Sequence, residues 1–313
     1  AGVRVRLLID GVGALFLARA ERARLAAGGV ELSVFSPLLA RRTSGPRNLR
    51  NHRKLVIADG ARLWAGGRNL AAEYFEGRPA ERPWRDLSLD LSGAVCAAAA
   101  RRFETDWIAS GGAPADLAAD PGSPALRAGD APLAPSGLAQ FLPSGPDQTE
   151  DTVQALLIDG CFRAERRIVA VTPYFVPDAA LETALRLAAH RGVEIDVCLP
   201  LRSNHRLADF ARHRALRSLC DAGARFHLLP EMIHAKAVVI DDSLALCGSV
   251  NLDSRSLLLN YESALVLYGA AEIDWIHEWI RALLPLTRTY ERRRPGLWRD
   301  VAEGLLLTLA YQL

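Results

Sequence analysis

One ten-residue pattern occurs twice in this 313-residue chain, and it limits the possible folds more than any other feature. Residues 51–60 read NHRKLVIADG and residues 233–242 read IHAKAVVIDD, so both contain His-x-Lys-x4-Asp. The only two lysines of the chain lie in these copies, and all other members of its 38 Lys and Arg residues are arginines. Fourteen residues after each histidine a glycine-led stretch begins, GGRN at 66–69 and GSVN at 248–251. The fold must therefore contain two copies of one unit.

The duplication extends upstream of the motifs. Residues 2–8 (GVRVRLL) and residues 192–198 (GVEIDVC) both alternate in the way that predicts a strand. Each half is thus predicted as strand, helix, strand, motif strand and partner strand, which is an α/β architecture. The second half has an earlier strand at 167–172 and a helix at 179–190 without counterparts in the first half. We expect a missing N-terminal segment to supply them.

Composition sets the boundaries between these parts. The first half is expected to span residues 1–109 and the second half residues 147–270. Residues 110–146 are rich in Ala, Gly, Pro and Asp, which favours an irregular linker. Residues 271–313 are expected to form a C-terminal helical tail, because apolar side chains between Trp275 and Leu284 follow helical spacing. Its apolar end is expected either to pack on the core or to contact a membrane surface.

Charge and cysteine content narrow the class of protein. A net charge of +2 argues against a broad basic surface, so no nucleic acid is expected as a partner. The sequence has no run of 18 uncharged apolar residues, so it predicts no membrane-spanning helix. The five cysteines have no metal or disulfide spacing, which is typical of reduced thiols in a protein that faces the cytoplasm. No oligomeric state is predicted.

The motif spacing puts basic side chains together. His52 and Lys54 are two residues apart, as are His234 and Lys236, and alternate residues of a strand point to the same face. If the two motif strands face each other, both pairs project into one pocket. Apolar residues of these strands are expected to anchor them in the core: Val56, Val238 and Ile240.

Two imidazoles and two ammonium groups suit the chemistry of a phosphodiester. One histidine attacks phosphorus and the other protonates the leaving alkoxide, and symmetry makes the two roles interchangeable. The ammonium groups, with amide donors from Asn69 and Asn251, replace a metal clamp. Because no carboxylate cluster indicates a Mg²⁺ site, neither a metal nor another cofactor is expected.

Four carboxylates accompany the histidines. Asp86 lies 34 residues after His52, and Glu262 lies 28 residues after His234, where a following strand could return beside each motif. We expect them to orient the imidazoles by accepting a hydrogen bond from the far ring nitrogen. Asp59 and Asp241 end the motifs before a turn, and a structural role there is at least as plausible as a chemical one.

The doubled motif resembles the phospholipase D superfamily, and the finer resemblance is to bacterial cardiolipin synthases. It covers nearly the whole chain. The segments that carry it, beside the motifs and the GGRN stretch, are Trp84-Arg85-Asp86, Ser144-Gly145-Pro146-Asp147, Thr172 to Pro177, Asn251 to Ser256 and Asn260-Tyr261-Glu262.

The resemblance implies a fold and a site. The fold would be two pseudo-two-fold-related α/β/α halves, each with a mixed sheet flanked by helices, with the active site at their interface. The family's motif positions imply catalytic residues, phosphate-binding residues and histidine-orienting residues. These are, in that order, His52, Lys54, Asp59, His234, Lys236 and Asp241; Asn69, Asn251 and Ser249; and Asp86 and Glu262. Family analogy favours His52 as the nucleophile and His234 as the acid and base.

The resemblance also implies a reaction and a location. Phosphatidylglycerol, or a similar anionic phospholipid, would be cleaved to phosphatidyl-histidine and passed to the hydroxyl of a second lipid. The protein would act on the cytoplasmic side of a bacterial inner membrane, peripherally or through the missing N-terminal segment. Three alternatives stay open: a phospholipase D that hydrolyses the intermediate, a nucleic-acid phosphodiesterase, and a catalytically silent lipid-binding scaffold.

Overall fold

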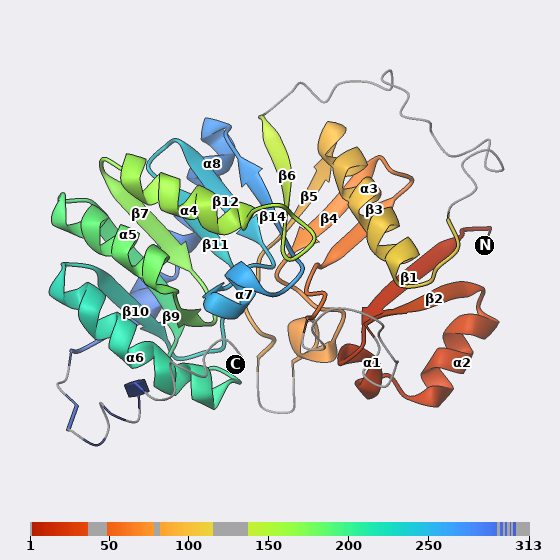
Figure 1. Ribbon diagram of the computed structural model, residues 1–313, viewed down its shortest axis with the longest axis horizontal. Helices are drawn as coiled ribbons and strands as arrows, with labels where there is room; N and C mark the ends of the chain where they lie inside the picture. The colour runs from red at the N-terminus through yellow and green to blue at the C-terminus, as the bar shows by residue number, and fades with distance from the viewer. Residues whose placement is uncertain are drawn as a thin grey trace.

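The computed structural model describes residues 2–36, 49–77, 82–114, 137–292 and a few positions between 295 and 304. Most of the predicted linker, and the end of the predicted tail from residue 305, lie outside the described residues. The chain is a mixed α/β protein in which two groups of strands meet side by side (Figure 1).

The second half is built on a mixed sheet that has eight strands in the described part of the chain, in the order β15-β10-β9-β7-β11-β12-β14-β6. β10, β9 and β7 run parallel to one another, and the remaining neighbours pair antiparallel. The strands are β6 (Ala139–Ser144), β7 (Arg167–Val171), β9 (Glu194–Pro200), β10 (Arg225–Leu229), β11 (Ala237–Ile240), β12 (Leu244–Gly248), β14 (Glu262–Leu267) and β15 (Arg288–Thr289).

Helices cover both faces of this sheet, which is why β11, β12 and β14 are buried along their whole length and are apolar except at Glu262 and Ser263, where β14 begins. Ile168 and Ala170 pack into the cluster under three helices on one face, α4 (Thr152–Arg163), α5 (Ala179–His190) and α6 (Arg206–Asp221). Val169 and Val171 point the other way, toward α8 (Ala270–Arg281), which lies behind the sheet in Figure 1. The expected strand and helix before β9 are confirmed as β7 and α5.

Helix α8 forms the start of the range predicted as a helical tail. Its apolar spacing does form a helix, but Ile273, Ile276 and Ile280 are fully buried against the sheet, whereas Trp275 is half exposed. A one-turn helix, η2 (Leu284–Leu286), then leads to β15 at the edge of the sheet. Residues 270–289 therefore belong to the fold of the second half.

The first half repeats the element order but not the single sheet. β1 (Val5–Asp10) and β2 (Val30–Phe35) form a parallel pair, and three further strands form a separate antiparallel sheet. The other elements are β3 (Leu55–Ala58), β4 (Arg62–Gly66), β5 (Ser88–Ser92), α1 (Gly13–Phe16), α2 (Arg19–Ala27), η1 (Ala72–Tyr74) and α3 (Ala94–Ala109).

The expectation of one mixed sheet in each half is therefore wrong for the first half. In the second half β7 pairs with both β9 and β11 and so joins them in one sheet. The described residues of the first half include no strand that pairs with both β1 and β3. Val56 on β3 is consequently 47% exposed, while its repeat counterpart Val238 is 5% exposed. The prediction that Val56 anchors its strand in the core is wrong, and the same prediction is confirmed for Val238 and Ile240.

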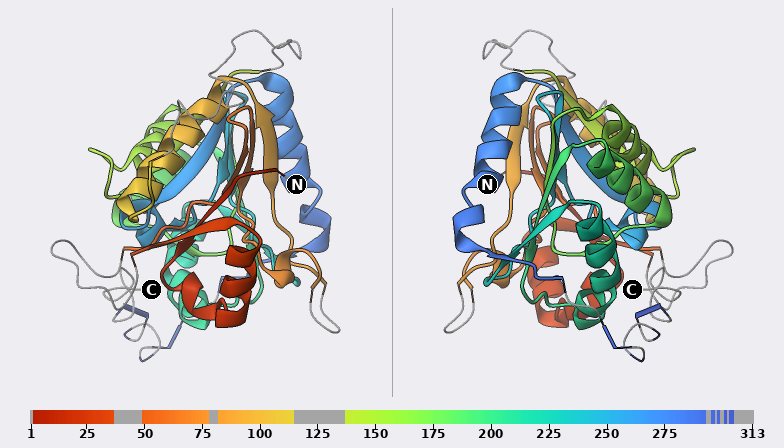
Figure 2. Two further views of the ribbon diagram at one scale, coloured as in Figure 1. Left: turned by 90° about the vertical axis from the view of Figure 1, so that its right-hand side faces the viewer. Right: turned by 90° about the vertical axis from the view of Figure 1, so that its left-hand side faces the viewer.

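The two halves share a core. Leu63 on β4 and Val95 on α3 pack in one buried cluster with Phe141 on β6 and Leu265 on β14. The views in Figure 2, in which β5 lies close to α8, agree with the packing of Leu87 into the cluster of that helix. β6 lies inside the range predicted as a linker, so the end of that range belongs to the large sheet.

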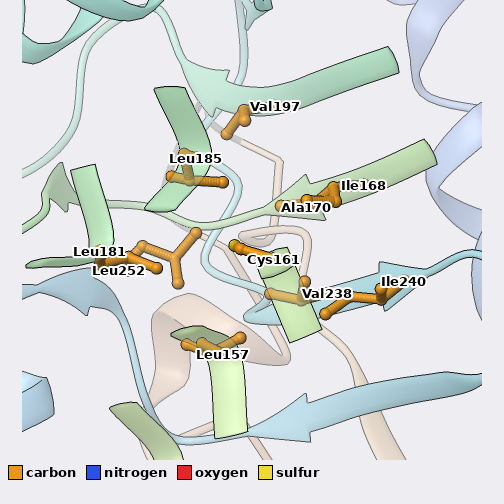
Figure 3. A pocket seen from close by; sticks show the side chains of 10 residues that line it. All are labelled: Leu157, Cys161, Ile168, Ala170, Leu181, Leu185, Val197, Val238, Ile240 and Leu252. Atoms are coloured by element: carbon orange, nitrogen blue, oxygen red, sulfur yellow. The ribbon is translucent and has the colours of Figure 1, made fainter. Parts of the chain in front are cut away.

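Three short elements complete the second half. β8 (Phe175–Val176) and β13 (Leu252–Asp253) pair in parallel, and α7 (Ser254–Leu258) follows β13. A cavity of about 20 Å³ lies in the core near these elements, lined only by apolar side chains such as Leu181, Val238 and Leu252 (Figure 3). It offers no polar partner to a water or ligand, so it is a packing void. No helix in the described ranges has both the length and the apolar character needed to cross a bilayer.

Candidate active site

Both motif histidines lie in extended segments just before a strand, and each segment is fastened to the opposite half. The amide of His52 donates to the carbonyl of Tyr261 at 2.8 Å, and the amide of His234 donates to the carbonyl of Arg85 at 2.6 Å. β3 and β11 begin one residue after Lys54 and Lys236, so the histidines precede the strands on which they were predicted. The alternation of extended backbone still applies to these segments.

Each imidazole is paired with a carboxylate from the other half. His52 Nδ1 lies 2.9 Å from Glu262 Oε1, and His234 Nδ1 lies 2.9 Å from Asp86 Oδ2. Sequence spacing had suggested that each carboxylate returns beside the motif of its own half, and the structure corrects this to a crossed arrangement. Neither half alone can orient its own histidine.

Both carboxylates are buried and held by further donors. Glu262 also accepts hydrogen bonds from Ser249 Oγ and from Asn260 Nδ2. Burial would raise the pKa of Glu262, but His52, Lys54 and Ser249 stabilise the anion and lower it. Burial raises the pKa of Asp86, against the opposing charge of Lys236.

Glycine at position 67 gives Asp86 its space. A Cβ atom there would lie 2.3 Å from Asp86 Oδ1, too close for any other side chain. The second glycine of the GGRN stretch therefore admits the orienting carboxylate, which gives this part of the motif a steric reason.

The lysines share one backbone contact in both copies, and Lys236 Nζ also lies 2.8 and 3.0 Å from the ring nitrogens of His234. Lys54 Nζ donates to the carbonyl of His52 at 2.7 Å, and Lys236 Nζ donates to the carbonyl of His234 at 2.6 Å. Burial lowers the pKa of Lys54 to about 8 and that of Lys236 to about 7. Among the described residues neither ammonium forms an ion pair within 4.0 Å. Two buried ammonium groups without a carboxylate partner favour a bound anion.

The electrostatics join the two motifs into one centre. Burial lowers the pKa of His234 well below its usual value, and the nearby charges of Lys236, Lys54 and His52 lower it further. Burial also lowers the pKa of His52, although Glu262 opposes the shift. Both rings are therefore neutral near pH 7, and each has a lone pair on Nε2 once Nδ1–H donates to its carboxylate.

The residues predicted to bind phosphate divide into two groups. Asn69 Nδ2 donates to Tyr74 Oη at 3.0 Å, and Asn251 Nδ2 donates to Ser256 Oγ at 3.0 Å, so both amides are anchored near the motifs. Ser249 instead donates its hydroxyl to Glu262. The structure thus gives Ser249 a contact that supports the orienting carboxylate.

Asp59 and Asp241 lie away from the imidazoles, at the far ends of β3 and β11. Both have positive φ, +52° and +49°, in the turns that follow these strands. Asp241 accepts the backbone amides of three consecutive residues, Glu165, Arg166 and Arg167, at 2.8 to 2.9 Å. These contacts lower the pKa of Asp241 although burial opposes the shift. The structural role considered for these residues fits the contacts of Asp241.

This geometry predicts unequal effects of the same substitution in the two copies. Asp241→Ala should reduce the free energy of unfolding by about 1–3 kcal/mol, because three backbone amides lose their acceptor. Asp59→Ala is the matched control, since Asp59 is exposed at an equally positive φ and shares only the backbone strain. Urea unfolding compares them, and equal losses of stability would contradict the role given to Asp241.

The sequence interpretation missed the aromatic residues around His234. The rings of Tyr74, Trp84 and Tyr174 lie 5.1, 5.8 and 6.4 Å from the imidazole, centre to centre. Tyr174 lies in the segment Thr172 to Pro177 that carries part of the family resemblance, and its hydroxyl donates to Asn204 Oδ1. Tyr74 could have been found by comparing the repeats, because it lies five residues after Asn69, as Ser256 does after Asn251.

Arg53, the residue between His52 and Lys54, joins the two halves beneath the site. Its guanidinium donates to Asp106 and Asp147 and to the carbonyl of Glu262.

In the described ranges no group of three or more His, Cys, Asp or Glu side chains could hold a metal ion.

Comparison with known proteins shows which family this chain resembles. Residues 157–284 match the family described as "Cardiolipin synthase, PLD-like domain". Cardiolipin synthase A from Pseudomonas putida is 36% identical over 266 residues, which are 85% of this chain and 53% of the relative. The enzyme of the same name from Pseudomonas entomophila is 34% identical over 282 residues, 90% of this chain and 57% of the relative.

A solved structure shows the same fold. The crystal structure of a phosphatidylserine synthase from Haemophilus influenzae aligns with a TM-score of 0.66 at 14% identity, covering 100% of this chain and 91% of that one. The present chain spans little more than half the length of the two cardiolipin synthases. Residues 157–284 are therefore a phospholipase D-like domain, in a chain whose similarity to cardiolipin synthases extends over most of its length.

Proposed function

We propose that this chain is a phosphatidyltransferase of the cardiolipin synthase type, which moves a phosphatidyl group from phosphatidylglycerol to a second phospholipid. The observation that carries the proposal is the crossed pairing of His52 with Glu262 and of His234 with Asp86, beside two buried lysines. We further propose that the two halves are related by an approximate two-fold axis, with the reaction at their interface.

In the first step His52 Nε2 attacks phosphorus. The N–P bond forms, and the bond from phosphorus to the oxygen of the head-group glycerol breaks. That oxygen takes the Nε2 proton of His234. The negative charge of the bound phosphodiester raises the pKa of His234, so that the ring can carry this proton. The products are phosphatidyl-His52 and glycerol.

In the second step the hydroxyl oxygen of another phosphatidylglycerol attacks the same phosphorus. Its proton passes to His234 Nε2, the N–P bond breaks, and His52 is regenerated neutral. Glu262 and Asp86 keep the two rings in the required tautomers throughout, since each accepts the Nδ1 proton. The product has two phosphatidyl groups on one glycerol.

Lys54 and Lys236 stabilise the charge that develops on the phosphoryl oxygens. Their pKa values, lowered by burial to about 8 and about 7, rise when an anion binds, so both are ammonium ions in the complex. Asn69 and Asn251 offer further amide donors to the same oxygens. We propose that the enzyme works on anionic phospholipids at the cytoplasmic surface of a bacterial inner membrane.

The test is to incubate the protein with phosphatidylglycerol vesicles and to identify the lipid products by mass. We expect cardiolipin and free glycerol in equal amounts. Phosphatidic acid as the main product would overturn transfer in favour of hydrolysis by water. An unchanged lipid, with no phosphatidyl adduct on histidine, would overturn the enzymatic proposal itself.

A further inference from the structure

The hydroxyl of Tyr74 contacts the ring nitrogen of His234 that does the chemistry. Tyr74 Oη lies 3.4 Å from His234 Nε2, and the side chain is buried at 4% exposure between Trp84 and the imidazole. Asp86 already engages Nδ1 of the same ring at 2.9 Å. Lys236 Nζ lies 3.0 Å from the same Nε2, so the phenol and the ammonium group both approach the ring nitrogen that Asp86 leaves unengaged.

The direction of the hydrogen bonds follows from the partners. His234 donates Nδ1–H to the Asp86 carboxylate, so Nε2 of the neutral ring is an acceptor. Asn69 Nδ2 donates to Tyr74 Oη at 3.0 Å, which leaves the phenol O–H free to donate toward Nε2. Burial, with the nearby charge of Asp86, raises the pKa of Tyr74. The phenol thus keeps its proton, and its O–H can donate a hydrogen bond to His234 Nε2 or to an oxygen bound beside it.

The second copy of the repeat has no tyrosine at the position that corresponds to Tyr74. Asn251 contacts the hydroxyl of Ser256 with the same five-residue spacing, and that short side chain replaces the phenol. Among the described residues no tyrosine hydroxyl hydrogen-bonds to His52, whose side chain is 29% exposed against 5% for His234. The two histidines consequently face different surroundings although their motifs are copies.

We infer that Tyr74 is a catalytic residue that donates a hydrogen bond to the alcohol oxygen at His234, first to the leaving glycerol oxygen and then to the oxygen of the acceptor hydroxyl. The inference rests on the proposed function. No proton leaves Tyr74: His234 Nε2 supplies the proton to the leaving oxygen and takes it from the acceptor. The phenol stabilises negative charge on that oxygen while the P–O bond breaks and while the new one forms.

Tyr74→Phe tests this role with two substrates. With phosphatidylglycerol we expect kcat to fall by about 10²-fold, as for the loss of one buried donor to a developing oxyanion. With the phosphatidyl ester of 4-nitrophenol, a leaving group that needs no donor, the first turnover should keep nearly the wild-type rate. Transfer to the acceptor should stay slow, so the variant is expected to release one equivalent of nitrophenol in a burst.

Tyr268→Phe is the matched control, because its hydroxyl contacts Gln140 at the surface and should affect neither substrate. Equal losses on both esters in Tyr74→Phe would assign the residue a structural role and overturn the inference, as would normal turnover of phosphatidylglycerol. A wild-type protein that leaves phosphatidylglycerol unchanged would refute the proposed function instead.

A second measurement covers the case in which Tyr74→Phe does not fold. The ¹⁵N shift of His234 Nε2 in the wild-type protein should be that of a hydrogen-bonded acceptor nitrogen. The shift of a free lone pair at this nitrogen would contradict the contact on which the inference depends.

Discussion

Replacing His234 with alanine is expected to lower the turnover of phosphatidylglycerol by about 10⁴-fold or more, while the protein stays folded. Without this imidazole no group supplies a proton to the leaving glycerol oxygen, and nothing takes one from the acceptor. His52→Ala should cost at least as much, since it removes the atom that attacks phosphorus. Product mass analysis measures both losses.

The two variants should differ with an activated lipid. With the 4-nitrophenyl ester, His234→Ala is expected to accumulate a phosphatidyl group on the peptide that contains His52, whereas His52→Ala forms no adduct. His190→Ala, at an exposed position on α5, controls for the loss of an imidazole as such. Near-normal turnover in either motif variant, or an adduct on His234 alone, would contradict the roles of His52 as nucleophile and His234 as acid and base.

The fold was predictable where the chain repeats itself. The order strand, helix, strand, motif strand and partner strand could be read from residues 2–8 and 192–198 and the motifs, because alternation and repetition are local properties of a sequence. What differed was the pairing between strands. The sequence did not reveal that β1 and β3 lie in separate sheets, or that β6 adds to the sheet of the second half.

The active site was likewise predictable from local patterns but not in the contacts between its two halves. His52, Lys54, His234 and Lys236 were predictable because their spacing and the scarcity of lysine mark them in the sequence. The crossing of Glu262 to His52 was not, because pairing between halves is set by the docking of two sheets. Tyr74 was overlooked because its partner His234 lies 160 residues away in the sequence, and the contact of Ser249 with Glu262 was not predicted.

The crossed pairing makes Glu262→Gln the second substitution with a large expected effect. Glutamine has nearly the same shape, but its amide can donate a hydrogen bond to His52 Nδ1 where the carboxylate could only accept one. The ring proton then moves to Nε2, which is the nitrogen that must attack phosphorus. We expect turnover to fall by about 10²- to 10⁴-fold, as when the orienting carboxylate of a catalytic histidine becomes an amide.

Losing the buried negative charge adds to this effect. Glu262 raises the pKa of Lys54 against the effect of burial, so Glu262→Gln should lower that pKa further and leave less ammonium to bind the phosphodiester. Glu278→Gln, at an exposed position on α8, is the control for the same change of group and should leave turnover unaltered.

Histidine ¹⁵N spectra separate the crossed arrangement from pairing within each half. Glu262→Gln is expected to change the tautomer of His52, which lies 210 residues away, and to leave the tautomer of His234 as it is. Asp86→Asn should do the reverse. If Glu262→Gln altered the tautomer of His234 instead, each half would orient its own histidine, and a single half could in principle assemble one imidazole–carboxylate pair. If the crossed result is obtained, each imidazole is correctly oriented only when the two halves are docked, so activity and docking should be lost together.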